Sequence, residues 1–205
     1  MEAVATIALT MGMAWASGIN LYAAILTLGV LGRSGHMQLP QNLEILQDPV
    51  VLGAAAVMYF LEFFADKIPG LDTVWDAIHT FIRIPAGAIL AAQAVGDVSP
   101  AVVLAAALLG GALAAGTHLT KAGTRAMLNA SPEPFTNWAA SLTEDAVVIA
   151  GVWAAATHPL AFLSFLVIFL LAMTWLLPRV WRALAAMFAR ITTFFRSSTT
   201  ETPTT

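Results

Sequence analysis

Long apolar stretches follow one another along most of this chain, and they restrict the folds that it can adopt. A helix needs about 20 residues to cross a hydrocarbon core about 30 Å thick, so the stretches leave room for roughly five to seven such helices. Only 10% of the residues are charged, whereas soluble domains have about 25%. The sequence therefore predicts an all-α integral membrane protein whose main partner is the lipid bilayer.

Breaks between the stretches predict about six transmembrane helices. The first apolar run, from Val4 to Gly32, is longer than a perpendicular crossing requires, so we expect it to tilt or to bend at Gly12 or Gly18. After Pro178, arginines alternate with large apolar residues, as in helices that lie at a membrane surface. The predicted segments are a first three-helix repeat (1–97), a second three-helix repeat (98–178), an interfacial amphipathic helix (179–196) and a disordered tail (197–205).

A weak internal repeat supports the division into two units. Ala16–Leu21 is similar to Ala114–Leu119, and Asp48–Leu52 is similar to Asp145–Ile149 at nearly the same offset. A unit with three crossings leaves the next unit inserted upside down. The prediction is therefore two inverted three-helix repeats, an architecture that is typical of small transporters with sites at bent or broken helices.

The distribution of lysine and arginine predicts the topology. With six crossings and both termini inside, only Arg33 faces the outside. The residues on the inner side are Lys67, Arg83, Lys121, Arg125, Arg179, Arg182, Arg190 and Arg196. Because cytoplasmic loops are rich in lysine and arginine, we expect a multi-pass protein of the plasma (inner) membrane with both termini in the cytoplasm.

Composition also removes several classes of function. The formal net charge of −3 argues against nucleic acid as a partner, because nucleic-acid binding requires a clustered basic face. The chain has no cysteine, which excludes disulfides, thiolate chemistry and cysteine-bound metals. We predict no cofactor, and the sequence leaves a homo-oligomer open.

One polar face stands out in the third predicted helix. Asp72, Asp76, His79 and Arg83 follow one another at spacings of four, three and four, so they share one side of a helix. Exposing four ionisable groups to lipid would be prohibitive, so we expect this face to point into protein or into a wet cavity. An alternative is that Asp72, Asp76 and His79 bind a divalent metal.

Three further groups of charged residues are predicted to meet. They are Glu62, Asp66 and Lys67; His118, Lys121 and Arg125; and Glu144 with Asp145. Unpaired charges at membrane depth are costly, so we expect Glu62 and Asp66 to approach Lys121 or Arg125. For single residues two simpler roles remain: the basic ones could mark the membrane interface, and Asp145 could complement a helix N-terminus.

Two segments of the chain resemble a known family. They are LEFFADKIPGLDTVWDAIHTFIRIPAGAILAA and GTHLTKAGTRAMLNASPEPFTNWAASLTEDAVV, and they are similar to the bacterial membrane proteins grouped as domain of unknown function 4126. The resemblance runs from about Gly12 to Pro159. It implies a small bacterial inner-membrane protein with the polar positions described above, and it supplies no established activity.

The leading hypothesis is a transporter or channel for an ion or small polar solute, built around a buried charged network. The candidate binding or coupling residues are Asn20, Glu62, Asp66, Lys67, Asp72, Asp76, His79, Arg83, His118, Lys121, Arg125, Glu144 and Asp145. A membrane-embedded metal-dependent enzyme is one alternative, but no catalytic residue can be assigned and the sequence favours a protein that is not an enzyme. A structural or accessory membrane protein, with charges that only hold the bundle together, is the other.

Overall fold

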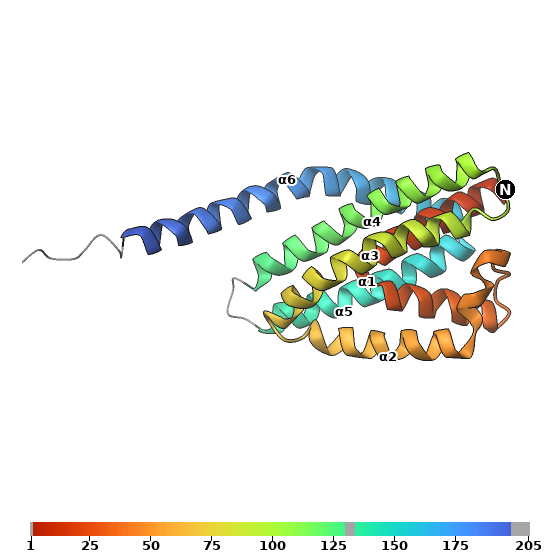
Figure 1. Ribbon diagram of the computed structural model, residues 1–205, viewed down its shortest axis with the longest axis horizontal. Helices are drawn as coiled ribbons and strands as arrows, with labels where there is room; N and C mark the ends of the chain where they lie inside the picture. The colour runs from red at the N-terminus through yellow and green to blue at the C-terminus, as the bar shows by residue number, and fades with distance from the viewer. Residues whose placement is uncertain (1, 130–133, 198–205) are drawn as a thin grey trace, which may run out of the picture.

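The computed structural model describes residues 2–129 and 134–197, and this part of the chain contains helices and no strands. Figure 1 shows a bundle of long helices from which the end of the last one extends. The elements are α1 (Glu2–Arg33), the 3-10 helix η1 (Gln41–Gln47), α2 (Pro49–Ala65), α3 (Leu71–Ala94), α4 (Pro100–Leu128), α5 (Pro134–Thr157) and α6 (Pro159–Ser197). The all-α prediction is confirmed for these residues. The predicted disordered tail (197–205) lies outside the described residues, except for residue 197, which is the last residue of α6.

Several helices have the length and composition to cross a membrane. Among the described residues these are α1, α4, α5 and the first part of α6, and η1 with α2 forms a fifth candidate that is bent by 66°. Large apolar side chains cover the outside of the bundle: Phe81 is 82% exposed, Ile168 67% and Leu108 66%. Soluble proteins rarely expose apolar surface on this scale. The chain is therefore built as a membrane protein, as predicted, although six crossings are not confirmed.

The first helix is a hairpin that folds back at Asn20. The backbone of Asn20 is extended (φ −146°, ψ 97°), and its Oδ1 accepts a hydrogen bond from the backbone N–H of Ala23 at 2.9 Å. This is the N-cap arrangement that starts a new helix. We therefore divide α1 into a first arm (residues 2–19) and a second arm (residues 21–33).

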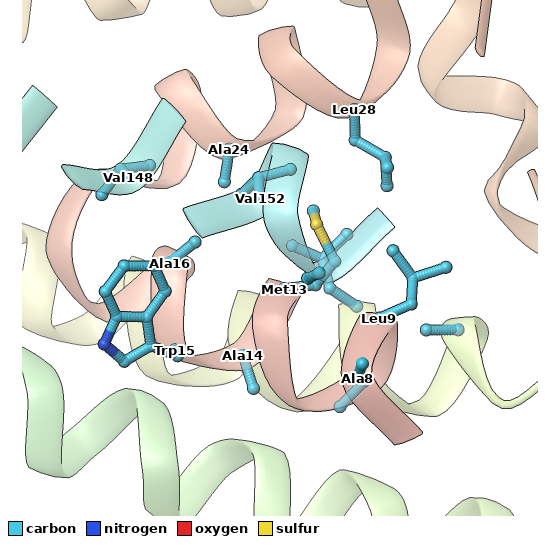
Figure 2. Packing of buried hydrophobic residues seen from close by; sticks show 14 of the residues in the cluster. Ala8, Leu9, Met13, Ala14, Trp15, Ala16, Ala24, Leu28, Val148 and Val152 are labelled. Carbon is cyan, nitrogen blue, oxygen red and sulfur yellow. The ribbon is translucent and has the colours of Figure 1, made fainter. Parts of the chain in front are cut away.

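Both arms of α1 pack along the same stretch of α5. Gly12 in the first arm lies against Ala155, and Val30 in the second arm lines one cavity with Trp153. Figure 2 shows Val148 and Val152 of α5 between the two arms, with Trp15 on one arm and Ala24 and Leu28 on the other. Residues far apart in α1 thus reach the same turns of α5, which is possible only if the chain reverses between them.

The reversal returns the end of α1 to the end of the bundle where this helix begins. In Figure 1 the N-terminus and the end of α1 lie at one end of the bundle, and α2 to α6 then run in alternating directions. The end of α6 consequently lies at the opposite end from the N-terminus. The sequence predicted one crossing for Val4–Gly32, whereas this segment is two helical arms that reverse at Asn20. The prediction that both termini lie on one side of the membrane stays a prediction.

Gly12 and Gly18 have a different role from the bends predicted for them. Both lie inside the first arm, where there is no space for a side chain: a Cβ on Gly12 would meet Ala155, and one on Gly18 would meet Thr117. The two glycines let α1 approach α5 and α4 closely, as small residues do between membrane helices. The bend is two residues beyond Gly18, at the side chain that can cap a helix.

Two other predictions concern segments of the chain. The inverted repeat is not confirmed, because α1 breaks at Asn20 whereas the aligned His118 lies inside the uninterrupted α4. The interfacial position of residues 179–196 stays a prediction, and these residues continue α6, which runs through Pro178 to Ser197. Membrane helices tolerate an internal proline when neighbouring groups satisfy the freed carbonyl.

The hairpin can be tested by single-cysteine labelling, since the chain has no cysteine of its own. Ala3→Cys lies in the first turn of α1, Ser34→Cys directly follows α1, and Ile68→Cys lies in the turn between α2 and α3. With a membrane-impermeant thiol reagent in oriented vesicles, we expect positions 3 and 34 to react from the same side and position 68 from the other. Reaction of positions 3 and 34 from opposite sides would show that α1 crosses the membrane.

Candidate functional site

Arg83 lies at the centre of a buried charged network. Its NH2 donates to Glu62 Oε1 at 2.7 Å, and its NH1 donates to Asp76 Oδ1 at 2.8 Å. Both side chains of the Arg83–Glu62 pair are fully buried, and Asp76 is 2% exposed. Asp76 and Arg83 are seven residues apart on α3, so two turns of one helix place them together, and Glu62 is supplied by the end of α2.

Lys121 of α4 is shared by several carboxylates. Its Nζ lies 3.1 Å from Asp66 Oδ2, 3.5 Å from Glu62 Oε1 and 3.7 Å from Asp76 Oδ1. It also donates to the backbone carbonyl of Ile19 at 3.0 Å. Ile19 directly precedes the break in α1, where the helix no longer uses all its carbonyls. The network is therefore attached to the place where the two arms of α1 meet, at Ile19 and Asn20, which we call the α1 tip or the hairpin tip.

Arg125, one turn further along α4, joins the network to α5. Its Nε and NH2 donate to the two oxygens of Glu144 at 3.1 and 2.7 Å, a bidentate arrangement. Its NH2 is also 3.5 Å from Asp66 Oδ2, and its NH1 donates to Asn137 Oδ1 at 2.6 Å. The predicted approach of Glu62 and Asp66 to Lys121 and Arg125 is thus present, with Glu144 beside them.

The tip of the hairpin has its own link to α5. Asn20 Nδ2 donates to Asp145 Oδ1 at 2.9 Å, while the same side chain caps the second arm through its oxygen. Asn20 is 1% exposed and Asp145 is 6% exposed. One amide group therefore sets the fold-back of the backbone and ties it to the carboxylate next to Glu144.

A small cavity leads to the network. Its volume is about 210 Å³, and it lies between the α1 tip and helices α4, α5 and α6. We call it the vestibule. Its polar lining consists of Thr117, Thr120, Thr124, Thr143, Lys121 and Glu144. Because Lys121 and Glu144 also belong to the ion pairs, and the Glu144 side chain is 20% exposed, the vestibule opens onto the network.

The polar face of α3 points inward, as the sequence predicted. Asp72, Asp76, His79 and Arg83 are all buried, while Ile78 on the opposite face is 58% exposed. His79 is 3.1 Å from the hydroxyl of Tyr22 in the second arm of α1. His118 of α4 also points inward, with Nδ1 3.2 Å from Arg83 NH1 and Nε2 2.7 Å from Thr80 Oγ1.

The predicted metal set does not come together. Among the residues that the structure describes, no group of three or more His, Asp and Glu side chains is arranged to hold a metal ion. Asp72 accepts hydrogen bonds from Asn129, Asp76 is paired with Arg83, and His79 contacts Tyr22. The three candidates share a helix face, but each contacts a different partner: Asn129 after α4, Arg83 of α3 itself and Tyr22 of α1.

Lys67 lies outside the ion pairs of the network. Its Nζ donates to the carbonyl of Phe63 at 3.1 Å and lies over the ring of that residue, in the turn that follows α2. Partial burial lowers the pKa of the Lys67 ammonium from its ordinary value. The sequence left two hypotheses for Lys67: a binding or coupling residue, or a residue that marks the membrane interface. Its position in a turn at the end of the bundle fits the second.

Sequence reasoning missed Asn137 and the threonines of the vestibule. Asn137 accepts from Arg125 and donates to the carbonyl of Asp66 at 3.2 Å. A signal for it was available, because Asn137, Ser141 and Asp145 follow one another at intervals of four on α5 and are all buried. Threonines in an Ala-rich helix gave no comparable signal, since they pack well on either side of a membrane helix.

Comparison with known proteins gives one match. The family described as "Domain of unknown function (DUF4126)" matches residues 7–179, a range that includes every residue of the network and of the vestibule. No curated protein and no solved structure matches the chain. Because the match covers most of the chain, the predicted family is confirmed: this protein belongs to the DUF4126 family of membrane proteins, whose function is unknown.

Proposed function

We propose that this protein is a small membrane transporter or channel for an ion or a small polar solute, with the buried network below the α1 tip as its site. The observation that carries the proposal is an imbalance. Among the described residues, the ion pairs join four carboxylates to three cations, and a cavity opens onto them. A network that served only to hold helices together would not need the extra carboxylate.

The energetic argument points the same way. An ionisable side chain at membrane depth costs about 2.5 to 3.5 kcal/mol unless it is paired or wet. Even well-paired buried charges usually stabilise a fold no better than apolar side chains of similar size. Four acids and three bases inside one bundle are therefore an expensive way to obtain stability, whereas intramembrane charges commonly mark ion or solute pathways.

The shape of α1 adds a second reason. Non-helical backbone at membrane depth is tolerated where it is enclosed by protein or lines a cavity. Transporters use such broken helices because their free carbonyls and helix ends bind ions. Here the break at Asn20 releases the Ile19 carbonyl from helix hydrogen bonding, and this carbonyl accepts a hydrogen bond from Lys121 of the network.

We assign roles on this basis. Glu62 and Asp66 bind the ion or couple its movement to a proton, and Lys121 and Arg125 balance their charge. Asn20 and Asp145 hold the hairpin tip over the site. By the positive-inside rule, the end of the bundle that carries Lys67 and the basic part of α6 faces the cytoplasm of an inner membrane, which places the C-terminus inside and the N-terminus outside.

A flux screen in liposomes tests the proposal. The purified protein would be reconstituted and assayed with a panel of inorganic cations, inorganic anions and small neutral solutes, next to empty liposomes and a Glu62→Gln/Asp66→Asn variant. We expect one class of solute to move through the wild-type protein and through neither control. Folded wild-type protein that moves no member of the panel would instead support a structural or accessory role.

A further inference from the structure

Resting on this proposed function, we infer that the vestibule and network bind a small inorganic monovalent cation, so that the transported or coupling ion is a cation rather than an anion or a neutral solute. Three features of the described residues carry this inference. They are the hydroxyl groups of the vestibule, the hydrogen-bonding state of the buried cations, and the oxygens in the network that lack partners.

Three of the four threonine hydroxyls in the vestibule already donate their proton to the backbone of their own helix. The Thr120 hydroxyl donates to the carbonyl of Gly116 at 2.8 Å, and the Thr143 hydroxyl donates to that of Ala139 at 2.7 Å. Thr117 likewise donates to carbonyls of its own helix at 3.0 Å. A hydroxyl has one proton and two lone pairs. Because these three hydroxyls have committed their protons to the helix backbone, their lone pairs are the atoms left to meet a ligand.

The positive groups next to the vestibule have no donors to offer an anion. The three N–H donors of Lys121 face the Ile19 carbonyl, Asp66 and Glu62, at 3.0, 3.1 and 3.5 Å. Every nitrogen of Arg125 donates to an oxygen of the protein, including both oxygens of Glu144. An anion entering the vestibule would therefore meet neutralised cations and threonine lone pairs.

The unfilled hydrogen-bonding capacity of the network is mostly that of acceptors. Glu62 Oε2, Asp66 Oδ1 and Asp76 Oδ2 are buried without a hydrogen-bond partner, and Arg83 Nε is the one such donor among the network side chains of the described residues. These carboxylates belong to residues that are 0 to 2% exposed. Buried acceptors without partners are costly, and a cation bound next to the network would lower the cost of the negative charge that they carry.

Charge and size narrow the class of ligand. The ion pairs contain one carboxylate more than cations, so one positive charge completes the balance. The volume of about 210 Å³ suits a small ion with part of its water shell. Oxygen ligands of this kind suit Na⁺, K⁺ and ammonium. No described group of three acidic or histidine side chains is arranged to hold a metal ion, so the cation would be held by vestibule hydroxyls together with Glu144 rather than by a cage of carboxylates.

Thermal unfolding of the full-length protein in detergent tests the inference. The probes are NaCl, KCl and NH₄Cl, each compared with N-methyl-D-glucamine chloride at equal ionic strength, and N-methyl-D-glucamine phosphate serves as the anion probe. A ligand that binds the folded protein raises the unfolding temperature in a saturable way. We expect at least one of the three small cations to do so, and phosphate to have no effect.

Two matched variants locate the effect. Thr120→Val removes a vestibule hydroxyl, and Thr27→Val removes a hydroxyl with the same bond to the carbonyl four residues earlier, at 2.7 Å, in the second arm of α1. We expect Thr120→Val to weaken the apparent affinity on the order of tenfold or more, as for a lost bond to a charged group. Thr143→Val repeats the test from α5, and Thr27→Val keeps the wild-type affinity.

The outcomes separate this inference from the transport proposal. Saturable stabilisation by phosphate would overturn the cation site, and so would the absence of stabilisation by all three small cations. Equal cation affinity in Thr120→Val, Thr143→Val and Thr27→Val would also overturn it. Liposome flux of an anion or a neutral solute without cation binding would leave the transport proposal standing and this inference wrong. Saturable cation binding at the vestibule without any flux would support the site and contradict transport.

Discussion

Glu62→Gln is expected to reduce solute flux to the level of empty liposomes while the protein remains folded. The amide keeps the shape of the side chain and an oxygen for Arg83, which Glu62 contacts at 2.7 Å, but it can neither carry the charge nor exchange a proton. The substitution also leaves three carboxylates against the three cations of the described ion pairs, so no uncompensated charge is created.

Glu44→Gln is the matched control for this prediction. Glu44 is exposed in η1, which precedes α2, whereas Glu62 lies near the other end of α2. Both variants would be checked by gel filtration and reconstituted at equal protein content. Flux that stays at the wild-type level in Glu62→Gln, in protein with a monodisperse gel-filtration profile, would defeat the transport role of this carboxylate.

Arg83→Met is expected to destabilise the protein strongly. Arg83 is fully buried and compensates Glu62 and Asp76 at once. Removing one partner from a buried ion pair costs about 3 to 5 kcal/mol, because a charge is left without compensation. For a chain of this size that corresponds to a fall of roughly 10 °C in unfolding temperature. The measurement is thermal unfolding in detergent by loss of monodisperse protein.

The control variants decide whether charge is the cause. Arg182→Met removes an exposed guanidinium that donates to the Pro178 carbonyl of its own helix, so we expect little change in unfolding temperature. Adding Glu62→Gln to Arg83→Met removes one of the two carboxylates left behind, and we expect it to recover part of the loss. Equal unfolding temperatures for Arg83→Met and Arg182→Met would contradict the assignment of Arg83 as the centre of the network.

The contacts of the network could be predicted because a charged side chain in such an apolar chain has few oppositely charged partners to pair with. Four charged residues lie next to apolar segments of the chain: Glu62, Asp66, Lys121 and Arg125. Placing them at membrane depth costs free energy, and pairing them with one another reduces that cost. Helical spacing did the same for the face of α3, where Asp76 and Arg83 are both buried. In these cases one physical requirement is strong enough to determine which side chains meet.

The hairpin in α1 could not be predicted from the same reasoning. Two apolar arms that turn back have the same composition as one long crossing, so the run from Val4 to Gly32 gave no sign of the reversal. The one local signal is Asn20, an N-cap residue within that run. Its side chain was assigned to the site, and its role in the backbone was missed. The direction of the second arm of α1 and the comparison of the two halves both depend on that single residue.

The vestibule was missed for a different reason. Thr117, Thr120 and Thr143 donate to their own helices, which any threonine in a membrane helix can do. What gives them a common environment is the packing of α4, α5 and α6 around the hairpin tip. That packing depends on the reversal at Asn20, so an error at one position also concealed the cavity.

The most direct test of the central claim is whether water reaches the network through the vestibule. Thr120→Cys places the only thiol of the chain in the vestibule, and Leu108→Cys places one on the apolar outer face of the same helix, where Leu108 is 66% exposed. Both variants would be reconstituted in liposomes with a membrane-impermeant thiol reagent on both sides, and Ser34→Cys would serve as the accessible reference. We predict that Thr120→Cys reacts, while Leu108→Cys does not react. A Thr120→Cys thiol as unreactive as that of Leu108→Cys, in protein whose Ser34→Cys variant reacts fully, would show that the network is sealed from water and would contradict the account.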